Sequence, residues 1–178
     1  MCGHHANRRL GRREFVGLAS CCAGAVLLGP RPALAGEHAK ALVLSCMDYR
    51  LVDDLVALME ANGLHDAYDH VVLAGASLGV VQANFAGWQD TFWQHLDLAM
   101  ELHGIDQVIV VDHRDCGAYR LALGEAAVDT TEKETQMHAL AIQEFALRVR
   151  DRHPDLTVRG YLMALDGTAE EIALDGAA

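Results

Sequence analysis

Two short segments of this sequence carry side chains that could bind a metal ion. They are residues 46–50 (CMDYR) and residues 113–117 (HRDCG). Thiolate sulfur and imidazole nitrogen are ligands that zinc selects. Three such ligands leave a fourth tetrahedral position for water or a nearby carboxylate. The two segments therefore predict a zinc site formed by Cys46, His113 and Cys116.

Each segment directly follows an apolar run that is typical of a buried strand, residues 41–45 before the first and residues 107–112 before the second. In an open sheet of parallel strands, ligands bind beyond the carboxyl ends of the strands, where the strand order reverses. If these two strands are neighbours and their connections leave to opposite sides, the candidate ligands lie together in that crevice.

The remaining pattern predicts one α/β domain, with a mainly parallel sheet flanked by helices. Further strands are expected at residues 70–74 and 156–165, with a turn of small residues at 75–79. Apolar periodicity and charged ends predict helices at residues 51–62, 90–102 and 132–152.

The pattern Cys-x-Asp-x-Arg followed by His-x-x-Cys-Gly resembles the β-class carbonic anhydrases. All six defining residues are present, namely Cys46, Asp48, Arg50, His113, Cys116 and Gly117. The resemblance extends over residues 39–172 and agrees with the α/β fold. One departure lies in residues 73–76 (LAGA), where the family usually carries Arg-Asn-Ala-Gly near the active site.

The resemblance implies zinc-dependent, reversible hydration of CO2 to bicarbonate and a proton. Zinc lowers the pKa of its bound water to about 7, so hydroxide is available to attack CO2 at neutral pH. Asp48 and Arg50 are the expected catalytic residues, because the guanidinium would keep the carboxylate ionised and aimed at the hydroxide. In closed members of the family the aspartate is instead a fourth zinc ligand, so Asp48 is also a candidate metal ligand.

The family's subunits are generally dimeric or larger, so the resemblance also implies a homodimer or higher homo-oligomer. Gly117 is expected to permit a tight turn or close packing beside the metal. Arg114 and Asp115, which do not define the motif, are expected to face solvent or to form hydrogen bonds.

Three functional alternatives follow from the same residues. The first is hydration of CO2, and the second is hydrolysis of a related linear molecule such as carbonyl sulfide or carbon disulfide, since the altered turn could reshape the pocket. The third is a non-catalytic zinc-binding or thiol-redox protein. Asp48 and Arg50 would then form an ordinary ion pair.

Composition and charge exclude another class of partner. The chain has 178 residues, 52% of them hydrophobic, which is enough for one domain with a substantial core. Its formal net charge of -11 argues against nucleic-acid binding, because a phosphate-binding protein needs a basic face.

Residues 1–35 resemble a twin-arginine export signal, with Arg12 and Arg13 before an apolar run at 16–28 and an A-x-A cleavage site ending at Ala35. The run is too short for a spanning helix, so no stable membrane insertion is expected after cleavage. We predict a cleaved leader, a periplasmic location and a zinc domain at residues 36–178. Lipidation at Cys21 is the alternative processing route.

Cleavage would leave only two of the five cysteines, Cys46 and Cys116. In an oxidising compartment a pair of cysteines ordinarily suggests a disulfide. The twin-arginine route carries folded proteins, so zinc could be captured by reduced thiolates before export. The sequence therefore favours a zinc site over a disulfide.

Overall fold

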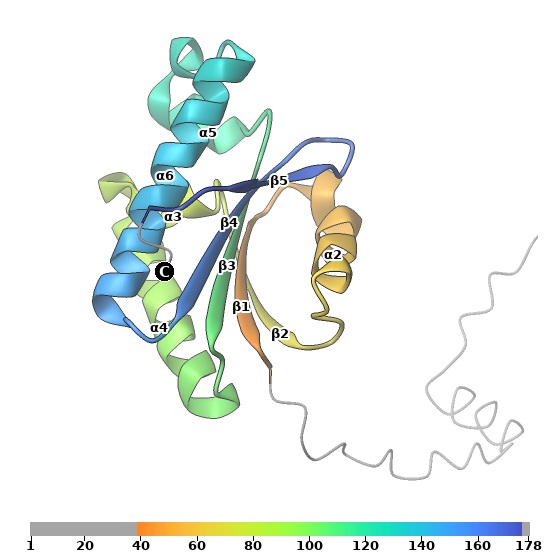
Figure 1. Ribbon diagram of the computed structural model, residues 1–178. Helices are drawn as coiled ribbons and strands as arrows, with labels where there is room; N and C mark the ends of the chain where they lie inside the picture. Colours follow the sequence, from red (N-terminus) through yellow and green to blue (C-terminus); the bar gives the residue numbers. More distant parts are fainter. Residues whose placement is uncertain (1–38, 176–178) are drawn as a thin grey trace, which may run out of the picture. The chain divides into compact units, whose positions relative to one another are not determined.

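A five-stranded sheet in the order β2-β1-β3-β4-β5 is the centre of the fold, which the computed structural model describes for residues 39–175 (Figure 1). The strands are β1 (Ala41–Cys46), β2 (Tyr68–Leu73), β3 (Gln107–His113), β4 (Thr157–Met163) and β5 (Ala169–Ile172). The first four are parallel, and β5 pairs antiparallel to β4. The predicted α/β fold with a mainly parallel sheet is confirmed.

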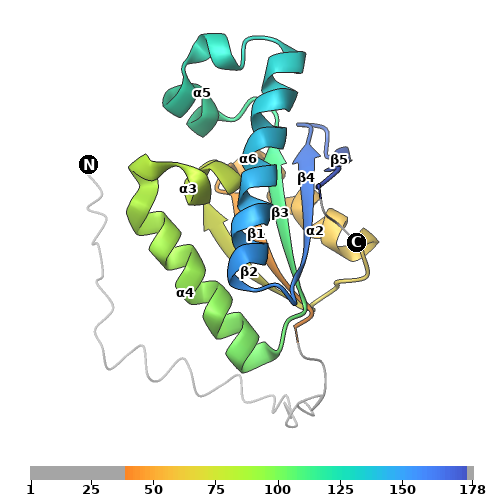
Figure 2. The same ribbon diagram turned by 60° about the vertical axis from the view of Figure 1, so that its left-hand side comes forward.

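Helices cover both faces of this sheet. α2 lies on one face, while α3, α4 and α6 lie on the other (Figures 1 and 2). The helices are α2 (Val52–Ala61), α3 (Ser77–Val81), α4 (Ala86–His103), α5 (Gly117–Leu123) and α6 (Thr131–Arg152). Three single 3-10 turns accompany them, at η1 (Tyr49–Leu51), η2 (Ala83–Phe85) and η3 (Glu125–Ala127).

The side chains of β1 explain why its sequence is continuously apolar. Val43 packs in the core beneath α2, whereas Leu42 and Leu44 pack in the core on the opposite face, with Phe92 of α4 and Phe145 of α6. A parallel strand covered on both faces needs apolar residues at every position. Polar residues are therefore tolerated only where the strand ends.

β1 and β3 are neighbours, as the sequence analysis required. Their register pairs Ala41 with Gln107 and Ser45 with Val111, so both strands reach the same edge of the sheet. The chain leaves β1 through α2 on one face and enters β3 from α4 on the other (Figure 2). The strand order reverses between them, which opens the predicted crevice at their carboxyl ends.

Several short elements differ from the sequence-based prediction. The predicted turn at residues 75–79 contains the start of α3, and α5 and β5 were not predicted. α4 begins at Ala86 rather than at residue 90. Elements of four to seven residues offer too few positions for a periodic pattern, which explains why α3, α5 and β5 escaped detection.

The predicted export signal at residues 1–35, with Cys21 and the cleavage site, lies outside the described residues. Among the residues that are described, no helix is both long and apolar enough to cross a membrane.

Gly160 of β4 provides a test of how tightly the sheet packs on α6. A methyl group added there would clash with Cγ2 of Ile142, which is fully buried. We expect Gly160→Ala to lower the free energy of unfolding by about 1–3 kcal/mol in urea denaturation, as overpacking typically does. Gly87→Ala is the matched control: its methyl group meets nothing within 4 Å, so it should be neutral or stabilising. Equal stability of the two variants would contradict this packing.

Candidate metal centre

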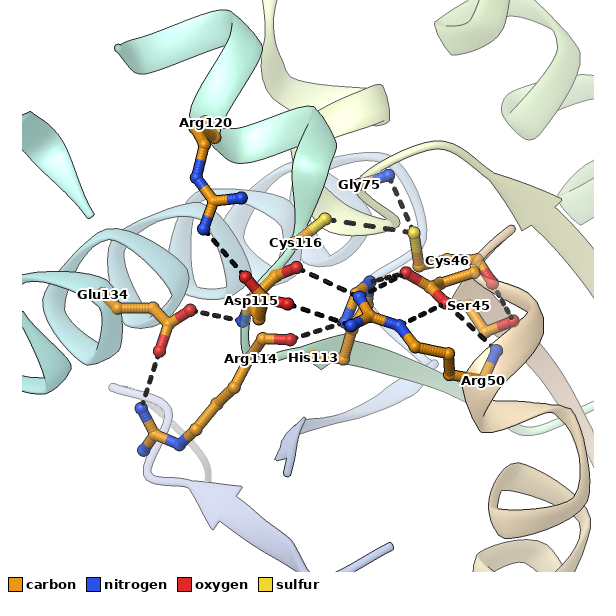
Figure 3. A network of polar contacts seen from close by, with 11 residues as sticks. Ser45, Cys46, Arg50, Gly75, His113, Arg114, Asp115, Cys116, Arg120 and Glu134 are labelled. Carbon is orange, nitrogen blue, oxygen red and sulfur yellow. Dashed lines mark hydrogen bonds and ion pairs between the residues drawn. The ribbon is translucent and has the colours of Figure 1, made fainter. Parts of the chain in front are cut away.

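Three side chains meet at the edge of the sheet. Cys46 ends β1, His113 ends β3, and Cys116 is the residue before the first turn of α5. Their ligand atoms all lie within 4.8 Å of one another, and Figure 3 shows the two sulfur atoms facing each other beside the imidazole. The three predicted zinc ligands are therefore brought together from two strands and a helix start.

The distance between the two sulfur atoms fits a shared metal ion. They are 4.0 Å apart, and both thiols are free. Two thiolates bound tetrahedrally to zinc at about 2.3 Å would be separated by about 3.8 Å. A disulfide would require about 2.05 Å. The cysteine pair thus has the spacing of zinc ligands.

The imidazole of His113 is oriented as a metal ligand. Its Nδ1 lies 2.8 Å from the carbonyl oxygen of Arg114, which can only accept, so Nδ1 carries the proton. Nε2 is left with a lone pair, and it is buried without a hydrogen-bond partner among the residues that the structure describes. Metal-bound histidines usually donate their other N–H to such an acceptor. The donor set and this orphaned nitrogen both fit zinc.

The thiols are poised to lose one proton before a metal arrives. The hydrogen bond with Cys116 lowers the pKa of Cys46 to about 4, and contacts with His113 and the Gly75 N–H, 3.3 Å away, act in the same direction. The resulting Cys46 thiolate raises the pKa of Cys116. Burial opposes protonation of His113, but the nearby negative charge of the Cys46 thiolate acts the other way, and the net shift of the His113 pKa is upward. A cation is needed to release the second thiol proton.

Asp48 lies beside the three ligands and faces Arg50. Its carboxylate caps η1 by accepting the Arg50 backbone N–H at 3.0 Å, and it accepts Nε at 2.9 Å and Nη2 at 2.7 Å. The hydrogen bonds from Arg50 lower the pKa of Asp48 to about 2. Its Oδ2 is 3.9 Å from His113 Nε2. The carboxylate is therefore ionised and adjacent to the metal position, with its oxygens held by the guanidinium.

Arg50 also binds Asp115, which the motif does not define. Nη1 of Arg50 donates to Asp115 Oδ2 at 2.9 Å, and Nη2 donates to the Asp115 carbonyl at 3.2 Å (Figure 3). Arg120 Nη2 donates to the other carboxylate oxygen at 2.8 Å. The expectation that Asp115 forms hydrogen bonds is confirmed, but its partner Arg50 was missed. Its position between His113 and Cys116 was the only clue in the sequence.

Gly117 does not have the expected role. Its φ is not positive, and a Cβ added there would meet nothing within 4 Å. It begins α5 in ordinary helical conformation. Among the described residues, Gly117 therefore forms neither the predicted tight turn nor a close contact, and that prediction is wrong.

A small apolar hollow opens beside Cys46, Asp48 and His113, on the α2 side of the sheet. Its apolar lining includes Leu51, Val52, Leu55, Val72, Val111 and Met163. Ser45 and His70 also line it and are joined by a hydrogen bond of 2.8 Å. The hollow offers a small uncharged molecule an apolar surface next to the candidate metal position.

Comparisons with known proteins agree with this geometry. Residues 36–173 match the family model described as "Putative carbonic anhydrase". An uncharacterised protein of Rickettsia conorii is 39% identical over 136 residues, which cover 76% of this chain and 73% of the relative.

Solved structures share the fold at low sequence identity. The carbonic anhydrase from Glaciozyma antarctica gives a TM-score of 0.52 at 21% identity, covering 94% of this chain and 98% of that one. A structure described among two tetrameric beta-carbonic anhydrases from Sordaria macrospora gives 0.50 at 13% identity, covering 78% and 82%.

The thiol pair predicts selective alkylation of the metal-free protein. Since the pKa of Cys46 is lowered to about 4, Cys46 should be a thiolate well below neutral pH, whereas Cys116 should keep its proton. At about pH 6, iodoacetamide should modify Cys46 faster than Cys116 and faster than an ordinary thiol. Peptide mass spectrometry of the full chain measures each cysteine separately. Saturation with zinc should protect both cysteines from alkylation. Equal alkylation rates of Cys46 and Cys116 in the metal-free protein would contradict the assignment of the shared proton to Cys116.

Proposed function

The chain belongs to this carbonic anhydrase family, and we propose that it catalyses the reversible hydration of CO2 to bicarbonate and a proton, with Zn²⁺ as cofactor. Cys46, His113 and Cys116 would hold the ion. One observation carries the proposal: two free thiols 4.0 Å apart face an imidazole nitrogen that is buried and, among the described residues, unpartnered. The Asp48–Arg50 pair beside this group supplies the polar environment that hydration needs.

When bound, zinc would supply a Lewis acid that lets water ionise near neutral pH. The residues around it would orient that water. Asp48, whose pKa is about 2, is an acceptor at neutral pH and would take a hydrogen bond from the nucleophile. Arg50 holds both oxygens of Asp48, which disfavours a swing of the carboxylate onto the metal. With so low a pKa, Asp48 cannot store the product proton, which must pass to solvent.

The apolar hollow supports a small, uncharged and linear substrate. CO2 has these properties, and so do carbonyl sulfide and carbon disulfide. Assembly into a homo-oligomer is part of the proposal, because Met47, Tyr49 and Val52 are exposed apolar side chains close to the candidate site. The Sordaria macrospora proteins, which share the fold, are described as tetrameric.

The first test is stopped-flow CO2 hydration by the zinc-loaded protein. We expect activity that is lost on treatment with a chelator, restored by zinc and abolished by Cys46→Ala. Asp48→Asn should lower kcat/KM by about 100-fold or more, because it removes an oriented acceptor. Asp53→Asn is the matched control, since Asp53 is an exposed carboxylate in the first turn of α2, and it should leave the rate unchanged.

Carbonyl sulfide and carbon disulfide are tested in parallel, with the same variants. Zinc-dependent turnover of these molecules without CO2 hydration would replace the proposed substrate. Zinc binding without turnover of any of the three would overturn the catalytic proposal.

We also propose that residues 1–35 direct export by the twin-arginine route, supported by Arg12, Arg13 and the apolar run that follows them. In a bacterial host with this pathway, Arg12→Lys combined with Arg13→Lys should block export and leave the precursor in the cytoplasm. Fractionation and intact mass measure the outcome. The wild-type product should begin at Gly36; a product cleaved before a lipidated Cys21 would contradict the proposed processing.

A further inference from the structure

A second carboxylate, Asp112, lies one residue before His113 and is entirely inside the protein. Only 1% of it is exposed, yet both of its oxygens accept hydrogen bonds. Oδ1 accepts the Ser77 backbone N–H at 3.0 Å. Oδ2 accepts three further bonds, from Ser77 Oγ at 2.7 Å, Tyr119 OH at 2.6 Å and His138 Nδ1 at 2.8 Å. Four donors from three helices therefore converge on one side chain of β3.

These donors are themselves fully buried. Ser77 and His138 are 0% exposed and Tyr119 is 1% exposed. Burial and the nearby Asp112 charge raise the pKa of Tyr119 well above its usual range, so its hydroxyl keeps the proton that it donates. A carboxylate without water needs such a complete set of donors, because each missing bond would leave charge unsolvated.

The chain neighbour of Asp112 and two of its three donor segments are each connected to a different ligand of the candidate metal centre. His113 follows Asp112 directly in the chain. Tyr119 lies in α5, the helix that begins directly after Cys116. Gly75, two residues before Ser77, donates its backbone N–H to the sulfur of Cys46 at 3.3 Å (Figure 3).

The contact with Ser77 restrains an unfavourable backbone. Gly75 has φ 77°, and Ala76 has φ 42° with ψ -104°, a conformation that alanine rarely adopts. Such residues persist only where the surrounding structure over-determines them. Ser77 is bonded to Asp112 through both its N–H and its hydroxyl, so the carboxylate anchors the turn that aims the Gly75 N–H at Cys46.

We propose that Asp112 is a positioning residue of the metal centre, and that with Ser77 and Tyr119 it holds the segments that bear His113 and Cys116 and the turn that contacts Cys46 in the geometry that binds zinc. It acts through other groups and touches neither metal nor substrate. The inference rests on the proposed zinc site but does not depend on which substrate is used.

Two conservative variants test this role in the full chain, each removing one hydroxyl. Tyr119→Phe and Ser77→Ala should weaken zinc binding by about 10- to 100-fold in competition with a chromogenic chelator, the usual cost of losing support around a metal ligand. In the cobalt-substituted proteins, the visible absorption bands should shift or broaden. Asp112→Asn, which presents an amide to three donors, should have a larger effect.

Tyr161→Phe is the matched control. Tyr161 is 4% exposed, and its hydroxyl donates to Asn62 Oδ1 at 3.1 Å in the core beneath α2. This variant also loses a hydroxyl that donates a hydrogen bond from a buried tyrosine, but on the sheet face opposite Asp112. Its zinc affinity and cobalt spectrum should match the wild type, even if thermal unfolding shows a comparable loss of stability.

The proposal would be overturned if Tyr119→Phe and Ser77→Ala had the same zinc affinity and cobalt spectrum as Tyr161→Phe at similar stability. The network would then be a polar part of the core alone. These readouts need no turnover. If the protein binds zinc but does not hydrate CO2, the proposed function is refuted. The role of Asp112 is still decided by the zinc affinities and cobalt spectra of these variants.

Discussion

The structure depends on one electrostatic constraint: two thiols and an imidazole lie within 4.8 Å of one another in a largely buried place. Without a cation, the Cys46 thiolate is stabilised mainly by the thiol of Cys116, which donates a hydrogen bond to it. Because the two sulfur atoms share one proton, the pKa of Cys46 is lowered and the pKa of Cys116 is raised. A divalent ion would replace that proton and also engage the free nitrogen of His113. This arrangement therefore fits a divalent metal ion.

Holding such groups together demands support of two kinds. On the solvent side, Arg50 lies between the carboxylates of Asp48 and Asp115. Exposed ion pairs of this sort contribute little to stability, so their value lies in orientation. On the interior side, Asp112 is shielded from water, and its bonds are correspondingly harder to replace. The outer set orients Asp48 toward the candidate metal position, and the inner set positions the segments around the candidate ligands.

Sequence reasoning predicted the parallel sheet and the meeting of Cys46, His113 and Cys116, because these rest on strong regularities. Long apolar runs identify strands buried on both faces, and the topology of parallel strands brings their ends to one edge. The inner network escaped because its members are dispersed along the chain. Ser77 and His138 carry no motif, and Tyr119 lies in a helix too short to show periodicity. Their convergence is a property of tertiary packing.

The departure from the family at residues 73–76 has a structural meaning that the sequence alone did not show. The side chains that the family usually carries are absent, but the backbone of this turn still serves the site, since the Gly75 N–H reaches Cys46. A backbone donor depends on conformation rather than on side-chain identity. It therefore tolerates substitution nearby as long as the strained turn is held, and the bonds from Ser77 to Asp112 supply that restraint. In this chain the turn is therefore positioned by the buried carboxylate of Asp112 rather than by polar side chains of residues 73–76.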